Sequence, residues 1–417
     1  MKIEAKNLDK QNQRAIPISL EMVRNAYRRI KRKGKSAGID GVSLKEFQAR
    51  EEDHLYVVYN RMSSGSYFPP EVKQVSIPKR SGKKRKLGIP TVRDRVAQTV
   101  IKELIEPRID KIFYEESYGY RPNKSAQQAL DKVRKNCWEK AWVIDLDIKN
   151  CFDSIDHQLL MKAVDKHVEE KWIKMYIRRW LEAPVVTKAE TIEKEGKGTP
   201  QGGVLSPLLA NLFLHYAFDK WMKDNFPNVS FVRYADDKIV HCVSKKQAEY
   251  VLQRIRQRLI DCKLELNEEK TSIVYCKMNG RNGNYPNVKF DFLGYSFKPR
   301  TTLNWKKNKK FLGFDAGISA ESQKRIIKDL KVKEERMNFC NNLQEVAEVL
   351  NPSIRGWLNY YGHIRRSEMS QVLVAIQYRI IKWLRKKYGR LKRRIKKTFS
   401  LLWKVKRVNP KMFAHWS

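Results

Sequence analysis

Two short acidic stretches contain the residue types best suited to chemistry. In the first, VIDLDI, the two-residue period of a β-strand places Asp145 and Asp147 on the face opposite three aliphatic side chains. The second, FVRYADDKIVHC, has the pattern of an apolar strand, a turn with Asp236 and Asp237, and another strand. Paired aspartates are common in turns, so the second stretch by itself is a weak indication of a site.

Together, the two stretches predict metal-assisted phosphoryl transfer. If the hairpin lies beside the first strand in one antiparallel sheet, Asp147 and Asp236 face each other and can hold two Mg²⁺ ions, or Mn²⁺, through oxygen ligands. Two such ions about 3.5–4 Å apart activate a 3′-hydroxyl and stabilise a leaving pyrophosphate. The sequence has no G-x-S-x-G motif and no Cys/His pair that spacing identifies, so nothing supports a nucleophilic serine or cysteine.

The elements that must position these residues change character along the chain. Its 417 residues exceed the ~250–300 at which single cores stop growing, so we expect two to three domains. Positions 1–65 have a helical pattern with a glycine-bounded loop, positions 66–317 mix β-branched strand runs with helical stretches, and positions 318–417 have only helical periodicity. This order predicts an α+β fold followed by an all-α region.

The charge of the chain predicts a polyanionic partner. Lysine and arginine number 86 against 46 acidic residues, a formal net charge of +40. Basic residues gather at positions 27–35, at 79–86 and in the last 49 positions. Any one run is as often a solvated face, but three on this chain favour contact with nucleic-acid phosphates. From the first run we take Arg28, Arg29, Arg32 and Lys33 as RNA-binding candidates.

Composition excludes several other classes of protein. Hydrophobic residues make up 41% of the chain, which is enough for packed cores and excludes a disordered basic tail. The six cysteines form no C-x-x-C pair and no histidines cluster beside them, so neither a zinc ribbon nor a disulfide framework is indicated. Without an apolar leader or a run of ~18–20 apolar residues, we expect a cytoplasmic protein with no membrane partner, in the bacterial cytosol or nucleoid.

Ordered motifs along nearly the whole chain add a family resemblance. The sequence resembles the group II intron-encoded reverse transcriptases, the maturases of bacterial mobile introns. It does so through AGIDG, VSIPKRSGKKRKLGIPTVRDRVAQ, SYGYRPNKSAQQAL, VIDLDIKNCFDSIDH, GTPQGGVLSPLLANLFLHYAFDKWM, FVRYADDKIVHC, LNEEKTSIVYCK, FDFLGYSFKPR and NPSIRGWLNYYG. The resemblance implies a right-hand polymerase, with an N-terminal extension and the start of the fingers at 1–65, fingers and an antiparallel-sheet palm at 66–317, and a helical thumb or maturase domain with a basic tail at 318–417.

The resemblance also assigns catalytic roles. Asp147, Asp236 and Asp237 match the family's catalytic aspartates, and the backbone carbonyl of Ile148 would complete a metal shell. Asp145 does not match and is expected to be a polar support. The implied activity is RNA-directed DNA polymerisation, a nucleotidyltransferase reaction that needs two Mg²⁺ ions.

Five further residues match positions that bind the incoming nucleotide. Lys79 and Arg85 would grip its triphosphate, since a point charge and a planar fork both suit phosphate oxygens. Gln201 would line the pocket, and Phe152 would lie under the sugar and exclude a 2′-hydroxyl; the alternative for Phe152 is an ordinary core position. Lys270 matches a lysine near the active site, with surface ion pairs to its two neighbouring glutamates as the alternative.

The resemblance further implies the macromolecular partners. These are a group II intron RNA, an RNA template with a DNA primer, dNTPs and a target DNA. In the thumb stretch RGWLNYYG, Arg355 and Tyr361 are RNA-binding candidates, whereas Trp357 is expected in the core. Longer relatives continue into an H-N-H endonuclease domain. The sequence up to Ser417 contains no such motif. Intron homing as a mobile element would therefore need a primer from elsewhere, such as a replication fork.

Three other readings stay open. An RNA-directed RNA polymerase could use the same palm, although Phe152 disfavours it. A protein whose polymerase has decayed would be an RNA-binding splicing factor only, and the intact aspartates disfavour that. A domesticated reverse transcriptase in host defence or repair would carry the same polymerase residues, so the sequence does not separate it from a mobile maturase.

Overall fold

The computed structural model describes most of the chain, and its contacts divide it into two compact units. The described residues are 16–31, 36–78, 84–187, 191–192, 196–304 and 308–416. The first unit contains positions 1–125, 146–240 and 249–272, and the second contains 126–145, 241–248 and 273–417. Because the units interleave in sequence, each is described by itself.

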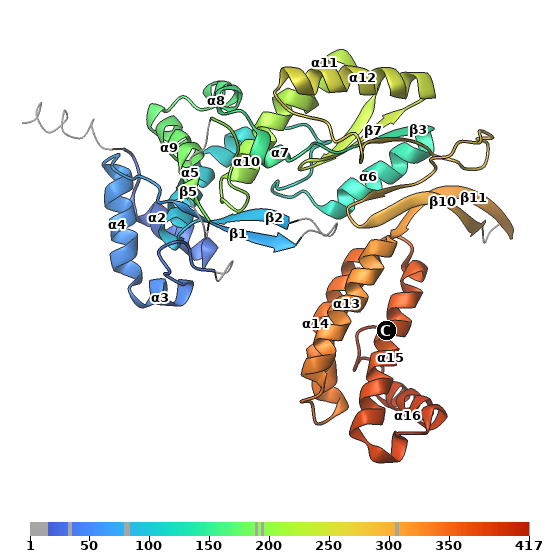
Figure 1. Ribbon diagram of the computed structural model, residues 1–417. Helices are drawn as coiled ribbons and strands as arrows, with labels where there is room; N and C mark the ends of the chain where they lie inside the picture. The colour runs from blue at the N-terminus through green and yellow to red at the C-terminus, as the bar shows by residue number, and fades with distance from the viewer. Residues whose placement is uncertain are drawn as a thin grey trace, which may run out of the picture. The chain divides into compact units, whose positions relative to one another are not determined.

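The first unit is mainly helical, with short strands between the helices (Figure 1). Its elements are α2 (Leu20–Ile30), α3 (Leu44–Ala49), α4 (Glu51–Ser63), β1 (Val72–Pro78), β2 (Lys84–Ile89), α5 (Val92–Asp110), α7 (Cys151–Ser154), α8 (His157–Asp165), α9 (Lys171–Glu182), β4 (Val185–Val186), β5 (Thr191–Ile192), α10 (Ser206–Leu214), a π-helix (His215–Asp219), α11 (Lys220–Asn225) and β6 (Ser230–Tyr234).

The second unit contains a long hairpin and the C-terminal helices. Its elements are α6 (Ala126–Glu139), β9 (Phe290–Phe292), β10 (Tyr295–Asn304), β11 (Lys309–Ile318), α13 (Ala320–Met337), α14 (Leu343–Tyr361), a 3₁₀ turn (Arg366–Met369), α15 (Ser370–Lys387), a second 3₁₀ turn (Gly389–Leu391) and α16 (Ile395–Val408). Four elements contain residues of both units, namely β3 (Trp142–Leu146), β7 (Asp237–Cys242), α12 (Lys245–Asp261) and β8 (Ser272–Tyr275).

Three sheets organise the strands. The first has the order β2-β1-β4-β5, with β1 and β2 antiparallel and β1 and β4 parallel. The second has the order β6-β7-β3-β8, and the third has the order β11-β10-β9 with both pairs antiparallel. The strands expected in the two acidic stretches are present as β3, β6 and β7, and the predicted α+β class is confirmed.

Helix α5 forms the centre of the first unit. It begins after Thr91, whose side chain accepts a hydrogen bond from the N–H of Asp94 at 3.1 Å, a standard N-cap. Its residues Val96, Val100 and Ile101 are all buried, and α2 and α4 pack against it. A helix covered on several sides is a rigid base for the loops that leave it.

The helical region after position 318 follows the apolar periodicity of the sequence. On α15, Ile376, Ile380 and Trp383 are buried, and the Trp383 indole donates to the carbonyl of Met337 at 2.7 Å. Helix α13 packs against both α14 and α15. The buried residues of α15 are thus spaced by four and three positions, as one face of a helix requires.

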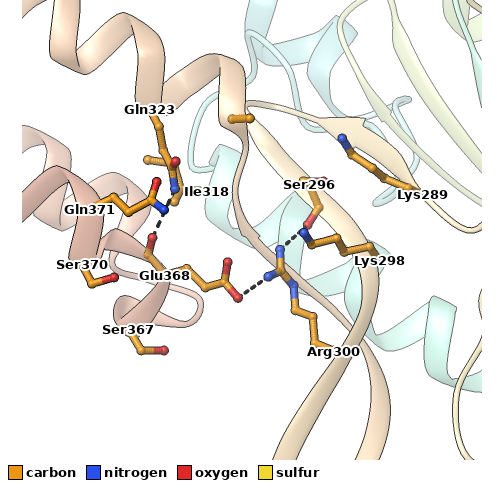
Figure 2. A pocket seen from close by; sticks show the side chains of 11 residues that line it. Lys289, Ser296, Lys298, Arg300, Ile318, Gln323, Ser367, Glu368, Ser370 and Gln371 are labelled. Carbon is orange, nitrogen blue, oxygen red and sulfur yellow. Dashed lines mark hydrogen bonds and ion pairs between the residues drawn. The ribbon is translucent and has the colours of Figure 1, made fainter.

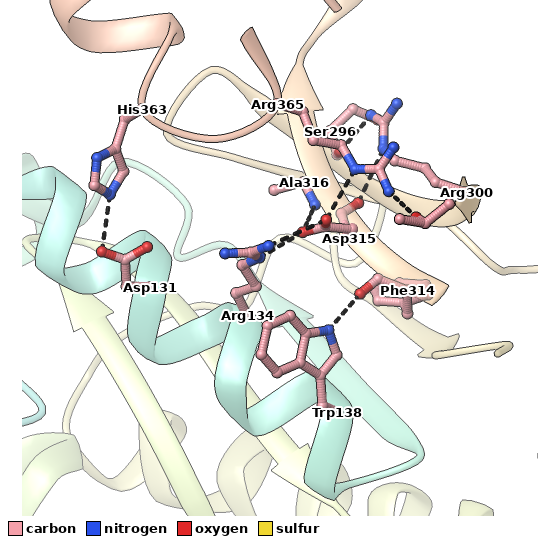
Figure 3. Close-up of polar contacts among 11 residues, drawn as sticks. Asp131, Arg134, Trp138, Ser296, Arg300, Phe314, Asp315, Ala316, His363 and Arg365 are labelled. Atoms are coloured by element: carbon pink, nitrogen blue, oxygen red, sulfur yellow. Dashed lines mark hydrogen bonds and ion pairs between the residues drawn. The ribbon is translucent and has the colours of Figure 1, made fainter. Parts of the chain in front are cut away.

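Asp315 on β11 joins three parts of the second unit (Figure 3). Its carboxylate accepts hydrogen bonds from Arg134 of α6 at 2.6 Å and from Arg365 at 2.9 Å. Burial raises the pKa of this carboxyl, but hydrogen bonds from the two arginines outweigh it and the net pKa is lowered. The indole of Trp138, also on α6, donates to the carbonyl of Phe314 at 2.8 Å. These contacts fix β11 against α6.

Two further observations concern the cysteines and the length of the helices. All six cysteines are buried and none forms a disulfide. Among the described residues, no helix combines the length and apolar character that crossing a bilayer requires.

Candidate active site

A buried ion pair fixes the backbone of the Asp236–Asp237 turn. The guanidinium of Arg233 donates to both oxygens of the Asp219 carboxylate, at 2.7 Å and 2.5 Å, and both side chains are fully buried. One remaining nitrogen donates to the carbonyl of Ala235 at 3.2 Å. Ala235 has a φ of +56°, so the turn needs this support to hold a non-glycine residue in the left-handed region.

The SYGY segment packs directly behind the same turn. The N–H of Tyr118 donates to the carbonyl of Arg233 at 2.8 Å, and the side-chain amide of Asn211 donates to the carbonyl of Gly119 at 2.7 Å. A Cβ at Gly119 would collide with the backbone nitrogen of Ala235, so only glycine allows this approach. Sequence reasoning missed these supporting residues, because nothing local links them to the turn.

Asp147 is oriented from the opposite side by the segment before β8. One carboxylate oxygen accepts from the Asn267 side chain at 2.7 Å and lies 3.1 Å from the ammonium of Lys270. The N–H of Asn267 also donates to the carbonyl of Asp147 at 2.9 Å. Ile148, the predicted carbonyl ligand, forms an isolated antiparallel bridge with Leu266. We did not predict a role for Asn267 from the sequence, although its position directly before the EEK stretch could have indicated one.

The charges of Asp236 and Asp147 affect the protonation of Asp237. Asp237 is an exposed residue, but protein atoms near its carboxyl group exclude part of the surrounding water. This desolvation, followed by the negative charges of Asp236 and then Asp147, raises the pKa of Asp237 to about 6, while Lys238 and Lys270 oppose the shift. Lys238 is buried, and its ammonium donates to the carbonyl of Asp236 at 2.8 Å.

The donor set fits a divalent cation in charge and chemistry. Within the described ranges, no three His, Cys, Asp or Glu side chains are gathered as a metal-binding group. However, Asp147, Asp236 and Asp237 offer the carboxylate oxygens that Mg²⁺ prefers, and their mutual repulsion raises a carboxyl pKa. A cation bound among them would relieve that repulsion, so the residues fit a metal.

The loop with Gln201 is connected to strand β2. The carbonyl of Gln201 accepts from the N–H of Gly88 at 2.6 Å, and its side-chain amide lies 3.4 Å from the carboxylate of Asp153. Gly202 has a φ of +116°, and a Cβ there would collide with the carbonyl of Gly88. The glycine therefore lets this loop lie directly on β2, the strand that contains Arg85.

The other predicted nucleotide-binding residues fall in different settings. Phe152, on α7, is 8% exposed, and its carbonyl accepts from the N–H of Thr199 at 2.8 Å. Arg85 pairs with Ile77 across the β1–β2 hairpin. Lys79 lies outside the described residues. Lys270 contacts Asp147 rather than its neighbouring glutamates, and its role in nucleotide binding stays a prediction.

A chain of buried hydrogen bonds also holds the backbone just after the Gln201 loop. The side-chain oxygen of Gln98 accepts from the N–H groups of Val204 and Leu205, at 2.8 Å and 3.2 Å. Its amide nitrogen donates to Asp94 at 2.8 Å, and Asp94 in turn accepts from the indole of Trp180 at 2.6 Å. Burial raises the pKa of Asp94 to about 6, despite these hydrogen bonds.

The N-terminal RNA-binding candidates lie on the surface. Arg28 and Arg29 are exposed on α2, and each pairs with a glutamate, at 3.2 Å and 2.6 Å respectively. Exposed pairs of this kind contribute little energy, so both side chains can exchange partners. Arg32 and Lys33 lie outside the described residues.

The two thumb candidates differ in exposure. Arg355 is exposed on α14, whereas Tyr361 is only 3% exposed. The Tyr361 ring packs against Tyr295, and its hydroxyl accepts a hydrogen bond from Arg325. Stacking of Tyr361 on RNA is therefore disfavoured by its burial. Trp357, expected in the core, is half-buried.

Comparison with known families decides the assignment. Residues 77–315, more than half of the chain, match the family described as reverse transcriptase (RNA-dependent DNA polymerase). The chain belongs to the reverse transcriptase family. Residues 324–401 of this reverse transcriptase also match the maturase-specific domain of group II introns. The predicted family and activity and the presence of a maturase-specific domain are confirmed, and RNA is a partner, whereas the predicted domain bounds stay a prediction. Reverse transcriptases depend on a divalent metal, so that expectation is also confirmed at this general level.

Curated relatives of the reverse transcriptase include intron-encoded proteins. It is 24% identical over 450 residues to "Group II intron-encoded protein LtrA" from Lactococcus lactis, covering 88% of this chain and 73% of the relative. It is 33% identical over 273 residues to "Protein YkfC" from Escherichia coli, covering 57% of this chain and 71% of the relative.

Similar solved structures include two telomerases. The structure of Candida albicans telomerase with a fragment of telomeric RNA matches at 13% identity and a TM-score of 0.47, covering 91% of this chain and 69% of that one. Apo telomerase from Candida tropicalis matches at 15% identity and a TM-score of 0.44, covering 55% and 53%.

Proposed function

We propose that this reverse transcriptase extends a DNA primer along an RNA template with dNTPs, using two Mg²⁺ ions held by Asp147, Asp236 and Asp237. The observation that carries the proposal is the match of residues 77–315, which include all three aspartates, to the reverse transcriptase family, together with the contact between Lys270 and Asp147. When bound, the ions would activate the primer 3′-hydroxyl and stabilise charge on the leaving pyrophosphate.

The chain's own residues orient the reacting groups. Asn267 holds one oxygen of Asp147, which leaves the other carboxylate oxygen for a ligand. Arg233 holds the carbonyl of Ala235 and thereby the turn that presents Asp236. Such pre-set orientation lowers the barrier because the groups need no rearrangement during the reaction.

The nucleotide would lie between the Gln201 loop and the strand that contains Arg85. Lys79 and Arg85 supply positive charge for its triphosphate, and the hydrogen bond from Gly88 to Gln201 connects that strand to the loop. Phe152 would close the pocket under the sugar, where its ring excludes a 2′-hydroxyl. The RNA polymerase alternative needs space at this position.

Primer extension by Asp236→Asn tests the catalytic assignment. Loss of one ligand charge should reduce extension on an RNA template by at least about a hundredfold, since metal-assisted stabilisation contributes several kcal/mol. RNA affinity should be unchanged. Asp224→Asn, which removes an exposed carboxylate paired with Lys220, is the matched control and should retain activity. Full extension by Asp236→Asn would refute the metal assignment.

The maturase region would bind a group II intron RNA, assist its splicing and bring it to a target DNA. The match of residues 324–401 and the excess of basic residues support this. We further propose that the protein acts in the bacterial cytosol or nucleoid, where that RNA is transcribed. Sequencing the RNA that copurifies with the protein would test this partner: an intron RNA supports it, and only unrelated RNA contradicts it.

Splicing and polymerisation should depend on different surfaces. Asp236→Asn should still promote splicing of a copurified intron, because the substitution leaves the basic surface intact. Loss of splicing together with extension would instead mean that the two activities share the palm. If wild-type protein splices but never extends a primer, the alternative of an RNA-binding splicing factor holds. If it extends a primer but no intron copurifies, the domesticated enzyme is favoured.

A further inference from the structure

A polar pocket in the second unit lies between strand β10 and the start of helix α15. Its volume is about 390 Å³. Figure 2 shows the side chains that line it. Strand β10 contributes Ser296, Lys298 and Arg300 to its lining, and the helical side contributes Ser370 and Gln371. No residue of the proposed active site lines it, so it requires its own explanation.

Ser296 has an unmet hydrogen-bonding capacity in this pocket. The residue is 4% exposed, and its hydroxyl has no hydrogen-bond partner among the described residues. Leaving a buried hydroxyl unpaired costs about 1–3 kcal/mol, so such groups usually have a partner. Because Ser296 is one of the residues that line the pocket, a ligand oxygen bound there would supply the missing acceptor.

The charges around the pocket favour an anion. Lys289, Lys298 and Arg300 line it against one acidic residue, Glu368, which leaves a formal balance of three minus one, or +2. Glu368 is already paired with Arg300, and Lys289 lies 3.8 Å from Asp291. Within the described part of the chain, the exposed ammonium of Lys298 has neither a hydrogen bond nor an ion pair, so it can bind a ligand.

Arg300 contributes fixed positive charge rather than a mobile donor. Its side chain donates to the carbonyl of Asp315 at 3.1 Å, to the carbonyl of Ser296 at 3.0 Å, and to Glu368 (Figures 2 and 3). It is only 6% exposed. The wall that carries Ser296 is therefore held in place before any ligand arrives, which reduces the entropy lost on binding.

Helix α15 adds the positive end of its dipole. The helix has 18 residues, and its N-cap residue Met369 provides no side-chain acceptor for the first turn. Ser370 and Gln371, its first two residues, line the pocket with donor groups. The N–H of Ser370 already donates to the carbonyl of Ser367, so the donors for a ligand here are the Ser370 hydroxyl and the Gln371 amide, beside the positive end of the helix dipole.

We propose that this pocket binds a phosphate group through Ser296, Lys298 and the start of α15. The same chemistry could be supplied by a backbone phosphate of a nucleic-acid strand or by a free phosphate, such as that of a mononucleotide. The inference goes beyond polymerisation, because it predicts binding that needs neither the aspartates nor a metal.

The test measures phosphate binding at this pocket directly on the full chain. Mass spectrometry would follow acylation of individual lysines with inorganic phosphate or with chloride at equal ionic strength. Phosphate should slow acylation of Lys298 but not of Lys310, an exposed lysine on the neighbouring strand β11. This site-by-site comparison separates the pocket from diffuse attraction to a basic protein.

Two variants test the residues of the pocket. Calorimetry should show about tenfold weaker phosphate binding for Ser296→Ala and for Lys298→Gln, because each loses one hydrogen bond to a charged ligand. Lys310→Gln should bind as wild type does. Ser296→Ala should keep full stability, since among the described residues its hydroxyl has no partner to lose. Unchanged binding in both pocket variants, or no protection of Lys298, would overturn the proposal.

Competition then identifies the source of the phosphate. If a short RNA oligonucleotide displaces inorganic phosphate from Lys298, the pocket takes a backbone phosphate. If AMP displaces phosphate and the oligonucleotide does not, it takes the free group of a mononucleotide. Both results support a phosphate site, whereas displacement by neither would contradict it. Asp236→Asn should bind phosphate normally, so failure of the polymerase assignment is distinguishable from failure here.

Discussion

Asp219 forms the last residue of a π-helix and pairs with Arg233 directly behind the acidic turn, with both side chains fully buried. The π-helix inserts between α10 and α11 and gives a wider turn at the point where Asp219 meets the guanidinium. Such insertions are rare and often occur at functional sites. The distance between the two charged groups is 2.5 Å.

Asp219→Asn should therefore destabilise the protein strongly. It leaves the Arg233 guanidinium without its counter-charge inside the protein, and breaking a buried pair in this way costs about 3–5 kcal/mol. Urea unfolding measures the loss. Asp224→Asn breaks only the exposed pair with Lys220 and should cost less than about 1 kcal/mol. Equal losses would mean that the buried pair does not support the turn.

Asn267→Ala should reduce the rate of primer extension more than the affinity for substrate. The side chain holds one oxygen of Asp147 at 2.7 Å, so its removal leaves the carboxylate free to rotate. We expect about a tenfold fall in kcat with little change in KM for dNTP, since orientation acts on the reacting state. Glu268→Ala, which breaks an exposed pair with Arg256, is the neighbouring control and should act as wild type. A change confined to KM would refute the orienting role.

Asp94 should make stability depend on pH in an unusual direction. Burial raises its folded pKa to about 6, above the value of about 3.9 expected when unfolded. Between these values the folded state holds the proton and the unfolded state does not, so stability falls as pH rises from about 4 to 6. The loss of stability due to Asp94 is about 3 kcal/mol, and it is complete once the pH lies above that window.

Asp94→Asn isolates this contribution from those of other groups. Urea unfolding of both proteins between about pH 4 and pH 7 should show the wild type losing stability relative to the variant as pH rises. Above that range the difference should be constant. A pH-independent difference throughout would show that Asp94 does not take up its proton in the folded state.

Phe152→Val should relax discrimination between deoxyribonucleotides and ribonucleotides. A smaller side chain opens space where a 2′-hydroxyl would lie, while the aspartates remain in place. The ratio of kcat/KM for dATP and ATP on one RNA template should fall by about tenfold or more. Phe231→Val, also in a buried position, controls for general loss of packing. An unchanged ratio would return Phe152 to a core role, and equal use of ATP by wild type would favour the RNA polymerase alternative.

Several features of the fold followed from the sequence because local chemistry determines them. The two-residue alternation around Asp147 and the apolar runs flanking Asp236 predicted strands that the structure contains. The helical periodicity of positions 318–417 predicted helices that the structure contains, among them α15 with Ile376, Ile380 and Trp383 buried. Period and burial are coupled within one element, so a single sequence is enough to predict both.

The partners of the site residues were decided only by the tertiary structure. Lys270 has glutamates beside it in sequence but contacts Asp147, and Gln98 reaches the backbone of Val204 far along the chain. Likewise, segments distant in sequence decide that the Tyr361 hydroxyl accepts from Arg325 and that the Ser296 hydroxyl has no partner among the described residues. Residue type and spacing indicate which chemistry a chain can do, because they act locally. Which donor meets which acceptor depends on how distant elements pack, and that has no signature in local periodicity.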